Sequence, residues 1–241
     1  MKIFEPLKPK IVLGIAAHPD DLEFSIAGSI AKWTSEGTKA YYLILTDGSK
    51  GTEDRNAIPK EMTELRRQEQ RDAGKIIGLS DVFFEDFEDG TLENSLELKK
   101  AICRIIRKVK PDVVLCMDPT FIYSADRGMI NHTDHRAGAM ATLDSVYPLA
   151  RDHLSFPELL TEEKLEPHKV KTLLMTNFEN HNFGVDVSAQ VETKLKALAA
   201  HRSQIPDLEQ RSNMLKQWMA NTGSKYGCSY AEAFVRLDMS L

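Results

Sequence analysis

Runs of apolar residues alternate with segments of helical periodicity along the first half of the chain. Residues 11–17 (IVLGIAA) are apolar throughout, which is typical of a strand buried on both faces of a sheet. Between such runs, apolar residues recur at the spacing of a helix that buries one side, and Gly37 and Gly78 stand where two of these helices would end. The pattern predicts strands over 11–17, 40–46, 81–86 and 112–117, with helices over 24–35, 60–78 and 95–108 between them.

This order of elements predicts a doubly wound α/β fold, with a mostly parallel sheet, helices on both faces and right-handed crossovers. Residues 147–168 contain three prolines and no clean period, so no element is predicted there. No repeat, low-complexity tract or shift in composition divides the chain, and we expect residues 1–241 to form a single domain. The remaining predictions are a loop over 118–131, helices over 132–145 and 188–201, and strands over 169–177, 183–187 and 231–237.

Composition narrows the function classes without naming one. The 241 residues are 42% hydrophobic and 28% charged, as in an ordinary globular protein. The net charge is −5 and the basic residues are scattered, which argues against a nucleic-acid partner. The N-terminal residues lack the apolar core of a signal peptide, and no apolar run approaches the length of a bilayer span. Three cysteines, far apart, fit a reducing compartment. We therefore expect a cytoplasmic protein without a membrane span.

A first polar cluster follows the strand over 11–17. Open α/β sheets bind ligands at the carboxyl ends of their strands, which draws attention to this turn. It contains His18, Asp20, Asp21 and Glu23 around a proline. A single aspartate there would be explained as a helix cap. His18 and Asp21, however, lie three residues apart, a spacing that lets their side chains converge in a turn.

A second polar cluster, Asn131 to His135 (NHTDH), follows the strand over 112–117 and its loop. His132 and His135 share a face if this segment is helical, although two histidines on a surface helix can occur by chance. The predicted fold places both clusters at one edge of the sheet. One histidine and one aspartate from the first cluster with one histidine from the second would form a three-ligand zinc site that keeps a position open for water. The second aspartate could then act as a base on that water.

Taken together, AHPDD with Glu23 and HTDH resemble the LmbE-like/PIG-L family of metal-dependent N-acetylglucosaminyl deacetylases, and the resemblance extends over nearly the whole chain. It implies a single Rossmann-like domain over 1–241. Two features depart from the common family pattern: only Gly28 remains of a double glycine, and the loop over 120–129 is this chain's own. Weaker matches are residues 46–51, Arg66 to Glu69 with Ala73 and Gly78, Asp89-Gly90, residues 201–204 and residues 230–234.

The resemblance also implies a role for each matching residue. His18, Asp21 and His135 would be the metal ligands, with zinc or another divalent ion such as Fe²⁺ bound. Asp20 would be the general base. His132 would hold the oxyanion or protonate the leaving amine, and Asp134 would orient His132. Arg66 and Asp89 would bind the sugar.

Several residues near these motifs also have a purely structural explanation. Arg66 could be a surface charge on its helix, with Arg67 pointing inward instead. Asp47 is explained as a turn residue before Gly48. His201 could be structural or could line the cleft. The remaining three histidines match no ligand position and are expected in loops or on the surface: His153, His168 and His181.

The predicted activity is removal of an acetyl group from an N-acetylglucosamine conjugate by zinc-activated water with an aspartate base. An amidase acting on a sugar–thiol conjugate or another N-acyl substrate would use the same metal site. A non-catalytic Rossmann-like nucleotide-binding module is disfavoured because the first turn reads HPDD rather than GxGxxG. The expected partner is a small N-acetylated sugar, and the resemblance implies a homo-oligomer, a trimer or a hexamer.

Overall fold

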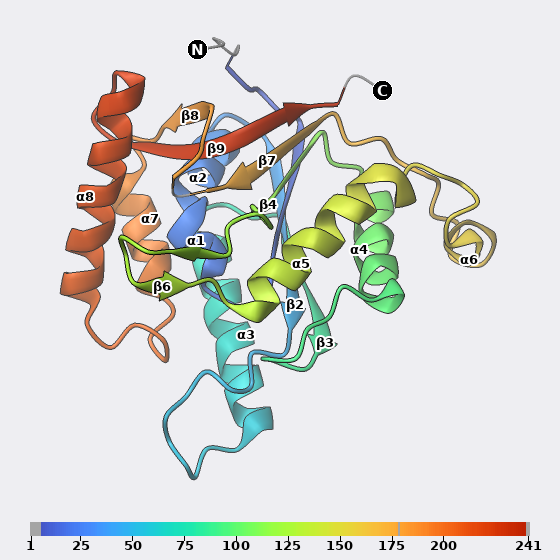
Figure 1. The fold of residues 1–241 in the computed structure, drawn as a ribbon, viewed down its shortest axis with the longest axis horizontal. Helices are drawn as coiled ribbons and strands as arrows, with labels where there is room; N and C mark the ends of the chain where they lie inside the picture. Colours follow the sequence, from blue (N-terminus) through green and yellow to red (C-terminus); the bar gives the residue numbers. More distant parts are fainter. Residues whose placement is uncertain (1–5, 178, 240–241) are drawn as a thin grey trace.

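A seven-stranded sheet runs through the computed structural model, which describes residues 6–177 and 179–239. The strand order is β3-β2-β1-β4-β7-β9-β8 (Figure 1). The first five strands in this order run parallel, and β9 is antiparallel to both of its neighbours. The predicted mostly parallel α/β fold is therefore confirmed. The strands are β1 (Ile11–Ala16), β2 (Lys39–Thr46), β3 (Asp81–Phe87), β4 (Val113–Met117), β7 (Thr172–Thr176), β8 (Phe183–Asp186) and β9 (Ala231–Asp238).

Two hydrophobic cores cover the two faces of the sheet, and adjacent residues of one strand belong to different cores. In β1, Val12 packs into the core under one set of helices and Leu13 into the core under the other. Because both faces are covered, the central strands are apolar at nearly every position. One core packs against α1 (Asp21–Ser25), α2 (Ala27–Ser35), α3 (Pro59–Ile76), α7 (Val191–Leu198) and α8 (Leu208–Tyr226). The other packs against α4 (Leu96–Val109), α5 (Thr133–Asp144), the turn η1 (Ser145–Leu149) and α6 (Pro157–Thr161).

Several elements differ from the sequence prediction. The helix predicted over 24–35 begins earlier and is broken at Ile26 into α1 and α2. The predicted loop over 118–131 contains a small hairpin, β5 (Tyr123–Ser124) with β6 (Met129–Ile130). Helix α8 was not predicted at all. Its buried residues are only Leu215, Met219 and Gly223, a narrow stripe that gives little periodic signal.

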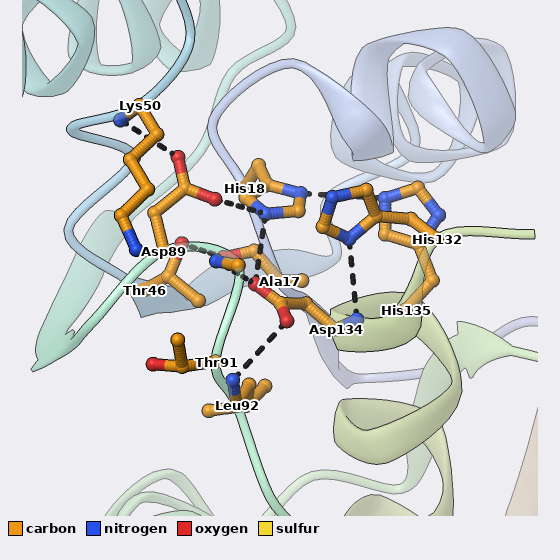
Figure 2. Close-up of polar contacts among 12 residues, drawn as sticks. Ala17, His18, Thr46, Lys50, Asp89, Thr91, Leu92, His132, Asp134 and His135 are labelled. Atoms are coloured by element: carbon orange, nitrogen blue, oxygen red, sulfur yellow. Dashed lines mark hydrogen bonds and ion pairs between the residues drawn. The ribbon is translucent and has the colours of Figure 1, made fainter.

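The carboxyl ends of the parallel strands gather the loops that carry the candidate chemistry. The turn after β1 leads directly into α1, and the loops after β2 and β3 lie next to it through the parallel pairing of these strands. Helix α5 packs against β1 and β4, and its first turn lies next to these loops (Figure 2). Among residues 6–177 and 179–239, no helix combines the length and the apolar character that crossing a membrane would require.

Candidate active site

The turn after β1 holds Asp20 in an unusual backbone conformation. Its φ of 96° lies in the left-handed region, which costs a non-glycine residue about 1–3 kcal/mol. Asp20 precedes α1, but its side chain makes no capping hydrogen bond to that helix in the described part of the chain. Its N–H instead donates to Oε1 of Gln70 at 3.1 Å. The helix-cap explanation therefore does not apply, and the carboxylate is left free for other contacts.

Three side chains from the two sequence clusters converge on one point. Nδ1 of His18 lies 3.3 Å from Nε2 of His135 and 3.5 Å from Oδ2 of Asp21. Nε2 of His135 lies 3.0 Å from Oδ1 of Asp21. Ligand atoms of a tetrahedral Zn²⁺ site, each about 2.0–2.2 Å from the ion, are about 3.3–3.6 Å from one another. The spacing and the His/His/Asp donor set both fit a divalent metal ion.

The opposite nitrogen of His18 is held by two buried carboxylates. Nε2 lies 3.0 Å from Oδ1 of Asp89 and 3.3 Å from Oδ2 of Asp134. Figure 2 shows both carboxylates on the far side of the His18 ring from His135. A proton on Nε2 satisfies these acceptors and leaves the Nδ1 lone pair facing His135, which is how a metal-binding imidazole is commonly oriented.

Backbone N–H groups fix these two carboxylates in turn. Asp134 accepts from the N–H groups of Gly90 at 2.6 Å and Leu92 at 3.1 Å, and Asp89 accepts from that of Lys50 at 3.0 Å. The loops after β2 and β3 are thereby tied to the first turn of α5. Asp134 was expected to orient His132, but its carboxylate lies on His18.

The charges of this cluster call for a cation. Burial lowers the pKa of His18, but hydrogen bonds to the carboxylates of Asp134, Asp21 and Asp89 outweigh that effect and raise it. Burial raises the pKa of Asp21, but the imidazoles of His135 and His18 bring it well below its usual range. Several carboxylates therefore surround these rings in a poorly solvated place. A divalent ion at the convergence point would supply the positive charge that a protonated His18 ring supplies without it.

Asp20 is the carboxylate beside this point that is not held by the histidines. Burial, followed by the charge of Asp21, raises the pKa of Asp20 to about 7. The Arg66 guanidinium, with an N–O separation of 3.8 Å, acts in the opposite direction. A carboxylate that titrates near neutral pH suits a general base, although a bound cation would lower this pKa again.

His132 borders the cluster from its exposed side. It caps α5, and its Nδ1 accepts a hydrogen bond from the N–H of Asp134 at 3.2 Å. Burial and the nearby imidazoles of His18 and His135 lower the pKa of His132, which favours the neutral ring. With Nδ1 accepting, the proton of the neutral ring is on Nε2. His132 can thus donate a hydrogen bond while remaining uncharged.

Arg66 points inward and Arg67 does not. The Arg66 guanidinium donates to the backbone carbonyls of Gly48 at 2.8 Å and Pro19 at 2.9 Å. Arg67 instead reaches the carboxylate of Asp86 at the sheet edge. Asp47 is a turn residue, as expected, because it accepts from the N–H of Ser49; it also accepts from that of Asp89.

The sequence did not predict the buried hydrogen-bonded chain beneath Asp20, which consists of Gln70, Glu23 and His201. Gln70 donates through Nε2 to Glu23 at 3.0 Å, and the other oxygen of Glu23 lies 3.1 Å from Nε2 of His201. His201 is 0% exposed, so it does not line an open cleft. Gln70 follows Arg66 by four residues on one helix face, a spacing that could have indicated it. The other three histidines lie apart from the site: His153 is exposed, His168 bonds the carbonyl of Pro111 and His181 bonds Tyr226.

Known proteins resemble the chain in both sequence and structure. Residues 13–146 match the family model described as PIG-L: GlcNAc-PI de-N-acetylase. A diacetylchitobiose deacetylase of Thermococcus kodakarensis is 33% identical over 207 residues, which are 86% of this chain and 74% of that protein. A probable N-acetyl-alpha-D-glucosaminyl L-malate deacetylase 2 of Bacillus anthracis is 27% identical over 206 residues, 80% of each chain.

A solved structure extends the similarity to nearly the whole fold. The N,N'-diacetylchitobiose deacetylase from Pyrococcus horikoshii, complexed with an inhibitor, superposes with a TM-score of 0.87 at 30% identity. The match covers 95% of this chain and 84% of that one. The structural similarity therefore extends well beyond residues 13–146, the segment that the family model matches.

Proposed function

Because the chain belongs to the PIG-L family, we propose that it is a metal-dependent hydrolase that removes the acetyl group from an N-acetylglucosamine-type substrate. The convergence of His18, Asp21 and His135, with the Asp20 carboxylate next to Asp21 and bound by no histidine, is the observation that carries this proposal. A catalytic metal site needs three protein ligands, an open position and a base. A nucleotide-binding module would need neither the ligands nor the base.

We propose Zn²⁺ as the ion, with Fe²⁺ as the alternative for the same donors. Such an ion would supply Lewis acidity to the amide carbonyl and to the attacking water. Asp89 and Asp134 hold the proton of His18 on Nε2, so that Nδ1 stays available as a ligand. Asp134 is thus assigned to orienting His18 through its carboxylate and His132 through its N–H.

The protein's own residues move the protons. Asp20 takes a proton from water as the water oxygen bonds to the carbonyl carbon. The Nε2–H of His132 donates to the oxyanion that develops. The C–N bond then breaks, its electron pair stays on nitrogen, and the amine accepts from Asp20 the proton that Asp20 took from water. Acetate and the free amine are the products. Arg66 keeps Asp20 in place through the Pro19 carbonyl.

Two substitutions test these assignments. We expect Asp20→Asn to keep the metal and to lower acetate release from N-acetylated sugars by about 100- to 10,000-fold, because the base is lost. His135→Ala should lose both the metal and the activity, whereas His153→Ala, at an exposed histidine, should keep both. Metal content by mass spectrometry and acetate release are the measurements. A fully active Asp20→Asn enzyme would contradict the mechanism, and a wild-type protein without metal or acetate release would contradict the function.

We further propose that residues 1–241 form one domain, that the protein is cytoplasmic and that it assembles as a trimer or hexamer. The three cysteines are free in the structure, as in a reducing compartment. The β5–β6 hairpin exposes Ile122, Tyr123 and Ile130 at 50%, 65% and 78% of their surfaces. Neighbouring exposed apolar side chains of this kind often mark a protein interface. Light scattering coupled to size-exclusion chromatography measures the assembly directly.

A further inference from the structure

A chamber of about 230 Å³ opens beside the three candidate metal ligands. Asp21 and His135 form part of its wall. The rest comes from α1, the end of β4, the β5–β6 hairpin, β7 and α8. Arg127 of the hairpin lies over the Trp218 ring at 5.0 Å, which joins the hairpin to α8. The apolar wall residues are Phe24, Met117, Phe121, Met129, Met214 and Trp218.

Among the polar wall residues, Ser25, Asp118 and Asn131 hydrogen-bond within the protein, whereas the Arg211 side chain is exposed at the mouth. Asp118 accepts hydrogen bonds from Thr120 and from Asn177. Asn131 donates to a backbone carbonyl of the loop and lies 3.0 Å from the ring of His135. Burying sugar hydroxyls without hydrogen-bond partners is costly. The chamber therefore suits an apolar group better than a sugar ring.

The methionines of the wall favour a flexible occupant. Met129 and Met214 are 38% and 43% exposed at the mouth, and Arg211 beside them is exposed as well. Methionine side chains adapt to occupants of different shape. The volume corresponds to roughly seven or eight liquid waters at about 30 Å³ each, far more than the methyl group of an acetyl needs.

The position of the chamber decides which end of the substrate enters it. The chamber is lined by the metal ligands Asp21 and His135, whereas Asp20, the proposed base, and His132, the proposed oxyanion donor, are not among its wall residues. The amine that leaves with the sugar must stay within reach of Asp20, which returns the proton to it. The acyl carbon chain, on the other side of the scissile C–N bond, then points into the chamber.

We propose that this chamber binds the acyl chain of the substrate, so that the enzyme hydrolyses N-acyl glucosamines with straight chains of about four to six carbons in preference to N-acetyl ones. The inference rests on the proposed function and names its acyl specificity. The reaction is the same hydrolysis: water adds to the carbonyl carbon, the C–N bond breaks, and a carboxylate and a protonated amine are released.

The direct test compares N-acetyl-, N-butyryl- and N-hexanoylglucosamine with the zinc-loaded enzyme. All three release glucosamine, so one amine assay measures them alike. Each methylene that enters an apolar site favours binding by roughly fourfold, so the two additional methylenes of the butyryl substrate should raise its kcat/KM over that of the acetyl one by roughly 15-fold. Met214→Trp, which narrows the mouth, should lower the ratio of kcat/KM for the butyryl substrate to that for the acetyl substrate to one or below. Met140→Trp is the matched control, since Met140 is 41% exposed on α5 and does not line the chamber, and it should leave the ratio unchanged.

A binding measurement gives a second readout that needs no turnover. The chain has two tryptophans, and Trp33 is 1% exposed, so a change of tryptophan emission on ligand binding reports on Trp218. Hexanoate should shift this emission at concentrations at which acetate does not, and Trp218→Phe should abolish the shift. Equal responses to hexanoate and acetate would overturn the inference.

The outcomes separate this inference from the proposed function. Hydrolysis of the acetyl substrate with a steep fall for the longer chains overturns the chamber assignment alone. A Met214→Trp enzyme with the wild-type ratio does so as well. If none of the three substrates is hydrolysed, the proposed function fails and takes this inference with it.

Discussion

Replacing Gln70 by leucine removes two hydrogen bonds directly beneath the candidate base. Gln70 is fully buried; its Oε1 accepts the N–H of Asp20 at 3.1 Å, and its Nε2 donates to Glu23 at 3.0 Å. Leucine is of similar size, so the substitution leaves little cavity and mainly deletes polar contacts. It strands a peptide N–H in the left-handed turn and takes one donor from a buried carboxylate.

The expected magnitude follows from these two losses. Each buried polar group without a partner costs about 1–3 kcal/mol, so Gln70→Leu should lower the free energy of unfolding by about 2–4 kcal/mol after some relaxation of the turn. Asp20 also loses a contact that holds its strained backbone at a φ of 96°. A shift of the carboxylate by about 1 Å lowers turnover by about 100-fold. We expect kcat to fall on that order, with KM and metal content close to wild type because the three ligands are untouched.

Urea unfolding, steady-state kinetics on an N-acetylated sugar and metal analysis measure the three effects separately. Gln68→Leu is the matched control, because Gln68 lies on the same helix but is exposed and bonds only Asp72 in the described structure. It should change stability by less than about 0.5 kcal/mol. If Gln70→Leu loses stability but keeps full kcat, Gln70 supports the fold without positioning Asp20. If Gln70→Leu keeps both its stability and its kcat, the hydrogen bonds of Gln70 support neither the fold nor the position of Asp20.

Two further predictions concern charges away from the metal ligands. Lys194 and Glu232 form an ion pair with side chains 1% and 2% exposed. Lys194→Met leaves a buried carboxylate without its cation and should lower the free energy of unfolding by about 3–5 kcal/mol. The double variant Lys194→Met with Glu232→Gln should recover part of this loss, and urea unfolding measures both. Burial raises the pKa of Asp112, but bonds from Lys171 and from the N–H groups that begin β1 lower it overall. Its stabilisation is therefore complete above the unfolded pKa of about 3.9 and is lost as the pH falls through the folded value, so wild type and Asp112→Asn should converge in stability as the pH is lowered below about 3.9.

The sequence by itself determined the sheet and the short-range part of the site. Adjacent β1 residues such as Val12 and Leu13 face different cores, and only a strand covered on both sides needs apolar residues at both positions. His18 and Asp21 converge because a tight turn brings residues three apart together. The second cluster could be matched to them because parallel strands end at one edge of the sheet, and the family resemblance then pointed to His135. These features depend on local spacing and on strand order, which a sequence displays.

Only the tertiary structure decided which distant groups support that site. Asp89 and Asp134 were expected to serve the sugar and His132, yet both carboxylates lie on His18. Glu23 meets His201 across 178 positions of sequence, and no local pattern relates the two. Helix α8 carries too narrow an apolar stripe to be predicted, yet its Trp218 closes the chamber beside the ligands. Such contacts depend on how finished elements pack against one another, because burial and hydrogen bonding between distant segments exist only once the chain has folded.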